Sequence, residues 1–390
     1  MYFIIDIVFW ISLILLIHSY LIYPVSVFII SLFFQKRYNT DENFLPDVSI
    51  IISVYNEERV IEKTIRNFLK LNYDIKKIEF VIGSDNSLDS TNDIIIKLQK
   101  EIPSIKFFPF NTRRGKSKVL NDLVKHAKSE ILIFSDANTI YHEDALKNLV
   151  KFYVDERVGG VSGKLELIEF EESKTSGSQE KKYWDFETWL KEKEGKLGCL
   201  IGANGGIYSI RKEFFCEIPT LHPVMDDFYL SLKVLEHKKE FLYQKDALAS
   251  EYTAPSLRVE FNRKIRNNSI NLSTIKSIKK LLSPTYGFIS YGLWSHKIIR
   301  WFTPLLLILL FTANSFLLSC SVFYFYSFIA QLVIFILGLM GFILKKFNYR
   351  NQPLLMIFYF FMTNAALLIG LVKFLIGKHT AYWQSTTRKS

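Results

Sequence analysis

The chain has 390 residues, of which 49% are hydrophobic, and a formal net charge of +11. This length has room for one α/β domain of roughly 200 to 250 residues together with membrane-embedded segments. The three cysteines, Cys199, Cys216 and Cys320, are scattered and have no metal-ligand spacing. The cysteine pattern therefore excludes a disulfide framework and a zinc-binding fold, and it indicates a reducing compartment.

Long apolar runs lie near both ends of the chain. Residues 3–34 include one acidic residue and one histidine as ionisable groups, and the run is long enough for one tilted membrane span. No basic leader or small-residue cleavage site accompanies it, so we expect an anchor and not a removed signal peptide. Residues 302–344 have room for two crossings, with a break near 314–321, and residues 353–376 have room for one.

The positive charge is concentrated beside these runs. Residues 257–300 hold nine lysines and arginines and a single acidic residue, Glu260. Next to membrane spans, such a segment favours anionic membrane lipids or a pyrophosphate as its partner, and we expect no nucleic acid. Lys36 and Arg37, which follow the first run, place the middle of the chain on the cytoplasmic side.

Lysines and arginines next to membrane spans tend to stay on the cytoplasmic side. This rule conflicts with a simple count of crossings near the C-terminal end. Lys345, Lys346 and Arg350 put the loop before the last apolar run inside. A single final crossing would then leave the basic tail 378–390 outside. Either the last segment is re-entrant or one crossing is miscounted.

The middle of the chain alternates the patterns of strands and helices. The predicted elements are strands over 48–54, 78–82, 105–110 and 131–134, and helices over 60–71, 90–100 and 116–127. Strict alternation of this kind predicts an α/β fold with a doubly wound, mostly parallel sheet and right-handed crossovers.

Acidic residues follow two of the predicted strands. The second strand is followed by Ser84-Asp85-Asn86-Ser87-Leu88-Asp89, and the fourth by Ser135-Asp136-Ala137-Asn138. Because open α/β sheets hold their ligands at the carboxyl ends of parallel strands, we expect a nucleotide and a metal to meet there. A third acidic group, Asp226-Asp227, opens a helical pattern.

Several motifs occur in order along the chain. They are the strand and loop that end in Tyr55-Asn56-Glu57, the turn Arg113-Arg114-Gly115-Lys116, the acidic Ser135-Asp136-Ala137-Asn138, the loop Gly202-Ala203-Asn204-Gly205, and Asp226-Asp227. Together they make the chain resemble the membrane-bound family 2 glycosyltransferases with the GT-A fold. That family is related to cellulose, hyaluronan and poly-N-acetylglucosamine synthases and to exopolysaccharide glycosyltransferases.

The resemblance implies a site for the donor nucleotide and its sugar. Asp85 matches the carboxylate that contacts uracil, while Arg114 and Lys116 match residues that supply charge for the diphosphate. The implied donor-nucleotide residues are Tyr55, Asn56, Glu57, Asp85, Arg114, Lys116, Asp136, Arg263 and Arg266. The donor or acceptor sugar would lie against the loop of Gly202, Ala203, Asn204 and Gly205, where glycine allows a close approach.

The resemblance also implies a divalent metal, Mg²⁺ or Mn²⁺, on Asp136 and Asn138. Such an ion needs hard oxygen ligands, because it bridges the protein and two phosphates. The family pattern is Asp-x-Asp, and Asn138 replaces the second aspartate with a neutral carbonyl ligand.

By position, Asp227 matches the catalytic base of the family, and Asp226 stands beside it. Repulsion between the two carboxylates and the donor phosphates is expected to raise the pKa of the base toward the range in which a general base works.

The chain departs from the processive synthases farther on. These carry Gln-x-x-Arg-Trp, whose tryptophan stacks on the acceptor sugar, where this chain has Arg263-Lys264-Ile265-Arg266-Asn267. A later Lys297-Ile298-Ile299-Arg300-Trp301 repeats the pattern, but it adjoins the next apolar run and we interpret it as an interfacial anchor.

We therefore expect an inverting glycosyltransferase, multi-pass in the cell inner (plasma) membrane, with a cytoplasmic catalytic domain. It would transfer a sugar from a UDP-sugar to a lipid-linked or growing glycan acceptor in cell-surface or extracellular polysaccharide biosynthesis. The alternatives are a processive polysaccharide synthase and a noncatalytic membrane partner with a degenerate metal site. The expected domains are a transmembrane helix over 1–36, a GT-A domain over 46–255, basic amphipathic interface helices over 256–300, about three transmembrane helices over 301–377 and a basic tail over 378–390.

Overall fold

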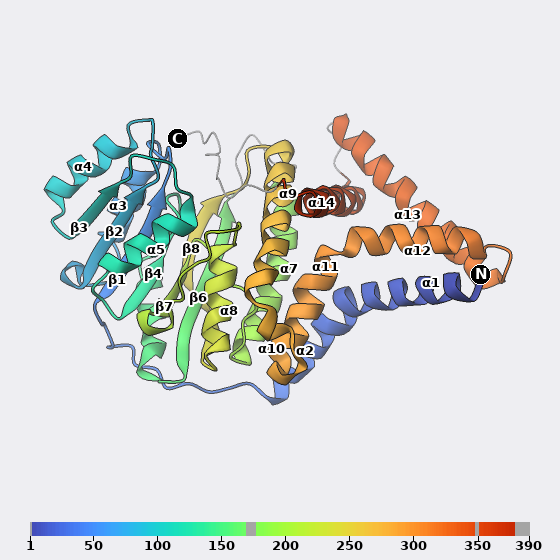
Figure 1. The fold of residues 1–390 in the computed structure, drawn as a ribbon, viewed down its shortest axis with the longest axis horizontal. Helices are drawn as coiled ribbons and strands as arrows, with labels where there is room; N and C mark the ends of the chain where they lie inside the picture. Colours follow the sequence, from blue (N-terminus) through green and yellow to red (C-terminus); the bar gives the residue numbers. More distant parts are fainter. Residues whose placement is uncertain (1, 169–176, 348–350, 379–390) are drawn as a thin grey trace.

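The structure is a computed structural model that describes residues 2–168, 177–347 and 351–378 (Figure 1). An eight-stranded sheet lies at one end of the molecule, and long apolar helices extend from the other. The strand order is β3-β2-β1-β4-β7-β6-β8-β5. The strands are β1 Val48–Val54, β2 Ile78–Ser84, β3 Ile105–Pro109, β4 Ile131–Phe134, β5 Ile140–Tyr141, β6 Val158–Ile168, β7 Tyr208–Arg211 and β8 Glu240–Tyr252.

The first four strands are parallel, and the register pairs Ile51 of β1 with Val81 of β2 and with Phe134 of β4. β7 runs antiparallel to β4 and β6, whereas β6 and β8 are parallel. The predicted α/β fold with a doubly wound, mostly parallel sheet is confirmed. The strict alternation ends after β4, and the reversed β7 enters the sheet next to it.

Alternate residues of β1 face opposite sides of the sheet, and all seven of its residues are buried. Ile50 and Ile52 pack in the core with α3 and α4, while Ile51 packs in the core with α5 and α8. Burial on both faces explains the continuous apolar run of this strand. The helices around the sheet are α3 Ile61–Phe68, α4 Thr91–Glu101, α5 Lys116–His126, α6 Ala145–Val150, α7 Gly177–Lys196 and α8 Asp226–Glu236.

The remaining helices are the basic α9, which lies beside α7 and α8, and the helices that lead into and form the apolar end of the molecule (Figure 1). They are α1 Tyr2–Ile17, α2 Tyr23–Phe33, α9 Leu257–Thr274, α10 Phe288–Gly292, α11 Ile299–Trp301, α12 Thr303–Leu317, α13 Val322–Lys346 and α14 Gln352–Leu375. Among the described residues, Tyr2–Phe33, α13 and α14 are each long and apolar enough to cross a membrane. A fourth candidate is the pair Phe288–Trp301 and Thr303–Leu317, which bends by 65°.

Candidate active site

The loops after β1 and β2 are tied together at the carboxyl ends of these strands. Asn56 and Asn86 both adopt left-handed backbone conformations, with φ of 54° and 60°, which asparagine tolerates better than most residues. Leu88 N donates a hydrogen bond to Asn56 Oδ1 at 2.8 Å, and Glu57 N donates to Thr91 Oγ1 at 2.8 Å. The predicted nucleotide loop is therefore a fixed turn.

Asp85 supports the turn that carries the basic residues. Its carboxylate accepts hydrogen bonds from the backbone N–H of Arg114 at 2.5 Å and of Gly115 at 2.9 Å. Gly115 has a φ of 84°, which glycine adopts without strain, and Lys116 begins α5 directly after it. Asp85 thus fixes the start of α5, and its contact with uracil stays a prediction.

The two arginines of this turn have different partners. The guanidinium carbon of Arg113 lies 3.8 Å from the centroid of the Tyr55 ring. Arg114 pairs with Asp122 at 2.7 Å and lies over the Phe110 ring. The motif singled out Arg114 for the donor, but it is Arg113 that stacks on the predicted nucleotide loop. A planar guanidinium on a ring is a stabilising arrangement, so Arg113 joins Tyr55 among the residues to test.

Lys116 connects acidic residues from two distant parts of the sequence. Its Nζ lies 2.9 Å from Asp136 Oδ1, after β4, and 3.1 Å from Asp226 Oδ2, at the start of α8. Burial opposes the charged form of Lys116, but the attraction of the two carboxylates raises its pKa above the ordinary value. The lysine is therefore a permanent cation between two elements of the site.

Asp227 faces the glycine loop. A Cβ atom added to Gly205 would lie 3.0 Å from Asp227 Oδ2 and 3.8 Å from Asp136 Oδ2. Two carboxylates from different elements thus converge on a residue without a side chain. Burial, reinforced by the negative charge of Asp226, raises the pKa of Asp227 to about 6. This is the direction that the sequence predicts for a general base.

The glycine loop is held by Lys191 of α7, which the sequence analysis did not identify. Its buried ammonium donates to Asn204 Oδ1 at 2.6 Å and to Ala203 O at 3.4 Å. Asn204 in turn donates to Gly163 O at 2.7 Å. Burial lowers the pKa of Lys191 to about 8. No sequence signal distinguishes it, because α7 contains five lysines.

α9 carries the two arginines that the resemblance implies. Arg263 pairs with Glu180 of α7. Burial is the main cause that lowers the pKa of Arg266, and the positive charge of Arg263 adds to it. The negative charges of Asp136 and Asp226 act in the opposite direction. Arg266 therefore lies within electrostatic reach of the site carboxylates, and Arg263 is engaged on α7. Their roles toward a donor remain predictions.

The segment 297–301 differs from the expected interfacial anchor. Trp301 is buried, and its ring packs edge-on against Phe228 with 5.7 Å between centroids. Lys297 pairs with Glu187 of α7 at 2.6 Å. The interpretation of this segment as an interfacial anchor is wrong, because the ion pair with Glu187 and the packing of Trp301 bury it inside the protein.

A buried ion cluster links α7 to the outer helices. Both ring nitrogens of His296 face carboxylate oxygens, Glu187 Oε1 at 2.8 Å and Glu194 Oε1 at 2.6 Å. Tyr23 of α2 donates to the same oxygen of Glu194 at 2.7 Å. Although burial opposes ionisation, His296 and Lys297 lower the pKa of both carboxyl groups. The cluster therefore joins α2, α7 and the segment before α11 through charge.

The turn of Asp136 and Asn138 has the chemistry to bind a divalent cation, since it offers two oxygen ligands, a carboxylate and the amide oxygen of the half-buried Asn138. The ammonium of Lys116 against Asp136 indicates that this position stabilises positive charge. Within the described ranges, however, no group of three or more His, Cys, Asp and Glu side chains could hold a metal. A cation here would need further oxygen ligands from the donor phosphates.

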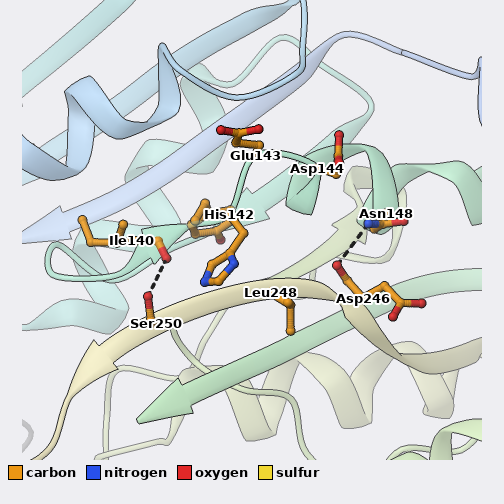
Figure 2. Close-up of a pocket in the computed structure, with 9 residues that line it drawn as sticks. Ile140, His142, Glu143, Asp144, Asn148, Asp246, Leu248 and Ser250 are labelled. Atoms are coloured by element: carbon orange, nitrogen blue, oxygen red, sulfur yellow. Dashed lines mark hydrogen bonds between the residues drawn. The ribbon is translucent and has the colours of Figure 1, made fainter. Parts of the chain in front are cut away.

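A separate hollow lies at the edge of the sheet, lined by β5, the turn after it, α6 and β8 (Figure 2). In it, Ser250 Oγ donates to Ile140 O at 3.4 Å and Asn148 Nδ2 donates to Asp246 O at 3.0 Å. Its lining includes His142 and acidic residues but none of the residues predicted for the site. The converging carboxylates, and not this hollow, mark the candidate active site.

The fold and the site together define an α/β domain that gathers carboxylates, a lysine and a glycine loop at the ends of its strands. Residues 49–215 match the family model described as Glycosyl transferase family 2. The chain therefore carries a family 2 glycosyltransferase domain, and the resemblance stated from its motifs is confirmed.

Individual relatives agree with this assignment. The poly-beta-1,6-N-acetyl-D-glucosamine synthase of Staphylococcus aureus is 35% identical over 126 residues, which are 32% of this chain and 29% of the relative. The beta-monoglucosyldiacylglycerol synthase of Trichormus variabilis is 29% identical over 171 residues, 43% of this chain and 36% of the relative. The chain thus spans about a third of the length of the curated relatives it matches.

A solved structure extends the likeness of the fold. The mannosyltransferase PcManGT from Pyrobaculum calidifontis, in complex with GDP-Man and Mn²⁺, has a TM-score of 0.72 and 21% identity. The similarity covers 95% of this chain and 100% of that one. The predicted GT-A fold is therefore confirmed.

Proposed function

We propose that the chain is an inverting glycosyltransferase that transfers a sugar from a UDP-sugar to a hydroxyl group of a lipid-linked or growing glycan acceptor in cell-surface polysaccharide biosynthesis. The observation that carries the proposal is the convergence of Asp227 and Asp136 on Gly205, with Lys116 bound to Asp136. A base with a raised pKa and a cation suited to a leaving diphosphate stand beside one glycine loop.

In the proposed reaction, Asp227 takes the proton of the acceptor hydroxyl as its oxygen attacks the anomeric carbon. The bond from that carbon to the diphosphate oxygen breaks, UDP leaves with the electron pair, and the configuration inverts in one displacement. Lys116 and Arg266 supply positive charge where the leaving group becomes more negative. Lys191 holds the loop that would position the sugar.

Asp136 and Asn138 are the residues that would hold Mg²⁺ or Mn²⁺. When bound, such an ion neutralises charge on the diphosphate. The structure of PcManGT with GDP-Man and Mn²⁺ supports a metal in proteins of this fold.

The apolar helices support a multi-pass protein of the inner (plasma) membrane, with the catalytic domain in the cytoplasm and anionic lipids as partners. A processive synthase is less well supported, because Asn267 stands where the stacking ring would be. A noncatalytic partner rests on Asn138 alone, and the converging carboxylates favour an enzyme.

The experiment is a donor screen with the purified full chain and a membrane extract as the source of acceptors. UDP-sugars are tested together with GDP-mannose, since a protein of the same fold was solved with GDP-Man. Release of nucleoside diphosphate by the wild type but not by Asp227→Asn supports the proposal. No turnover with any donor contradicts it, and the length of the product separates single addition from processive synthesis.

A further inference from the structure

Both ends of α14 contact the body that carries the active site. At its start, Gln352 Oε1 accepts hydrogen bonds from Gln179 at 2.5 Å and from Lys182 at 3.3 Å, both on α7. Near its end, the ring of Phe374 lies 5.3 Å from the ammonium of Lys276, just beyond α9. Both ends of this apolar helix are therefore held against the part of the protein that carries the active site.

Between these ends, α14 packs along α9. Tyr359 donates a hydrogen bond to Glu260, and Asn268 Nδ2 donates to Leu367 O at 2.7 Å. Gly370 makes the closest approach, because a Cβ atom there would lie 2.7 Å from Ile265 O. The pairs Tyr359–Glu260, Leu367–Asn268 and Phe374–Lys276 advance in the same direction along both segments, as expected for helices that lie side by side.

This arrangement does not fit a helix that crosses a bilayer. The stretch from Gln352 to Phe374 is roughly 33 Å long at 1.5 Å per residue, about the thickness of a hydrocarbon core. A crossing would carry one of these ends to the far side, away from α7 and α9. In Figure 1, α1 and α12 extend lengthwise away from the sheet, whereas α14 is seen nearly end-on beside α9.

The charges that flank α14 give an independent argument. Lys345 and Lys346 close α13 shortly before it, and Lys378 follows it. Basic residues near a membrane segment remain on the cytoplasmic side. Positive charge at both ends is therefore expected of a helix whose ends lie on the same side, and a crossing would place one group outside.

We infer that α14 does not cross the membrane but lies along its cytoplasmic face, with one side on α9 and α13 and the other on the lipids of the inner leaflet. The chain then crosses with the helix of α1 and α2, with α12 and with α13. The apolar composition of α14 follows from this position, because it faces protein on one side and lipid on the other; its lipid-facing residues include Met356, Ile369, Val372 and Leu375. The conflict between the basic tail and the charge rule disappears.

The placement has a consequence for the site, because α9 carries Arg263 and Arg266. A helix that rests on the inner leaflet and packs along α9 holds these arginines at a fixed height above the lipid surface. The inference concerns placement and does not depend on the proposed activity, so its test has no catalytic readout.

Cysteine labelling in intact cells tests which side each end of α14 occupies. The background is the full chain with Cys199→Ala and Cys216→Ala, in which Cys320, between α12 and α13, reports the outer side. Two further versions add Cys320→Ser and either Phe347→Cys or Ser390→Cys, which flank α14. We expect a membrane-impermeant maleimide to label both flanking cysteines only after permeabilisation. Labelling of either one in intact cells overturns the inference.

A second measurement determines how deeply residues of α14 lie in the bilayer, instead of which side they occupy. Nitroxides at Met356, Ala365 and Val372, in vesicles with anionic lipid, report depth through their relative accessibility to oxygen and to a water-soluble nickel complex. A helix along the surface gives three similar, shallow depths. A crossing helix makes Ala365 the deepest by roughly 10 Å, given a core about 30 Å thick, and this outcome would reject the placement. Val333 in the middle of α13, also lipid-exposed, is the control for a deep position.

Discussion

Lys116 Nζ lies 2.9 Å from Asp136 Oδ1, so the first residue of α5 is joined to the turn after β4. Asp85 holds the turn before that lysine through two backbone N–H groups. The cation at the centre of the site is therefore placed by the loops after β2 and β4, the two strands that flank β1 in the sheet. Its position suits a leaving group that gains negative charge.

Asp136→Ala is expected to abolish both sugar transfer and metal-dependent binding of UDP, because a cation loses the carboxylate ligand of this turn. Titration calorimetry with UDP, in Mn²⁺ and in chelator, measures the effect. Asp93→Ala, on the exposed first turn of α4, is the control. Wild-type affinity and rate in both conditions would show that Asp136 is not the metal site.

Asp227→Asn is expected to lower the rate of transfer by roughly two to four powers of ten, the usual contribution of a positioned base. Donor binding should change little, because asparagine keeps the shape of the site but cannot take a proton. Asp226→Asn should do less, since adjacent residues of a helix point about 100° apart and Asp226 contacts Lys116. If Asp226→Asn proves the more damaging, the two roles are exchanged.

The pH dependence of kcat/KM should have an acidic limb near 6, because burial raises the pKa of Asp227 to about 6. The base works only when deprotonated, so activity rises as the pH rises through this value. Asp226→Asn removes a neighbouring negative charge and should shift the limb to lower pH. A limb that stays in place in this variant would assign the titration to another group.

Lys191→Met should lower transfer by roughly ten- to a hundredfold, since it leaves the buried Asn204 Oδ1 without this donor, a loss of about 1 to 3 kcal/mol. Steady-state kinetics and thermal unfolding are measured together. The matched control is Lys196→Met on the same helix, whose side chain is 41% exposed. Equal losses in the two variants would mean that the position of Lys191 at the loop is unimportant.

The basic segment after the catalytic domain predicts that Lys264, Lys276, Lys279 and Lys280 bind anionic lipid headgroups. Lys264 lies 3.6 Å from Glu260 and packs over the rings of Tyr183 and Tyr359, so it is removed from the set. Lys279 and Lys280 are exposed. Their reversal to glutamate should reduce activity in anionic vesicles much more than in neutral detergent, as each basic residue near the surface contributes about 1 kcal/mol. Equal losses in the two media would indicate a folding defect.

The local signals in the sequence were sufficient for the parallel half of the sheet. The apolar runs of β1, β2 and β4 are fully or almost fully buried, and such runs have the same appearance in any parallel sheet. The residues after them, Asp85 and Asp136, therefore had to lie at one edge. The pair Asp226-Asp227 could likewise be identified from the sequence, because it stands at the start of a helical pattern, and it begins α8 in the structure.

Only the tertiary structure placed Lys191, Trp301 and α14. Lys191 is one of five lysines on its helix, and what distinguishes it is the loop packed against it. Trp301 adjoins an apolar run, yet packing against Phe228 buries it. α14 is long and apolar enough for a span, whereas contacts with α7 at its start and with Lys276, just beyond α9, hold its two ends. Periodicity and hydropathy describe a segment by itself, and these three features depend on neighbours that the chain brings together from distant positions.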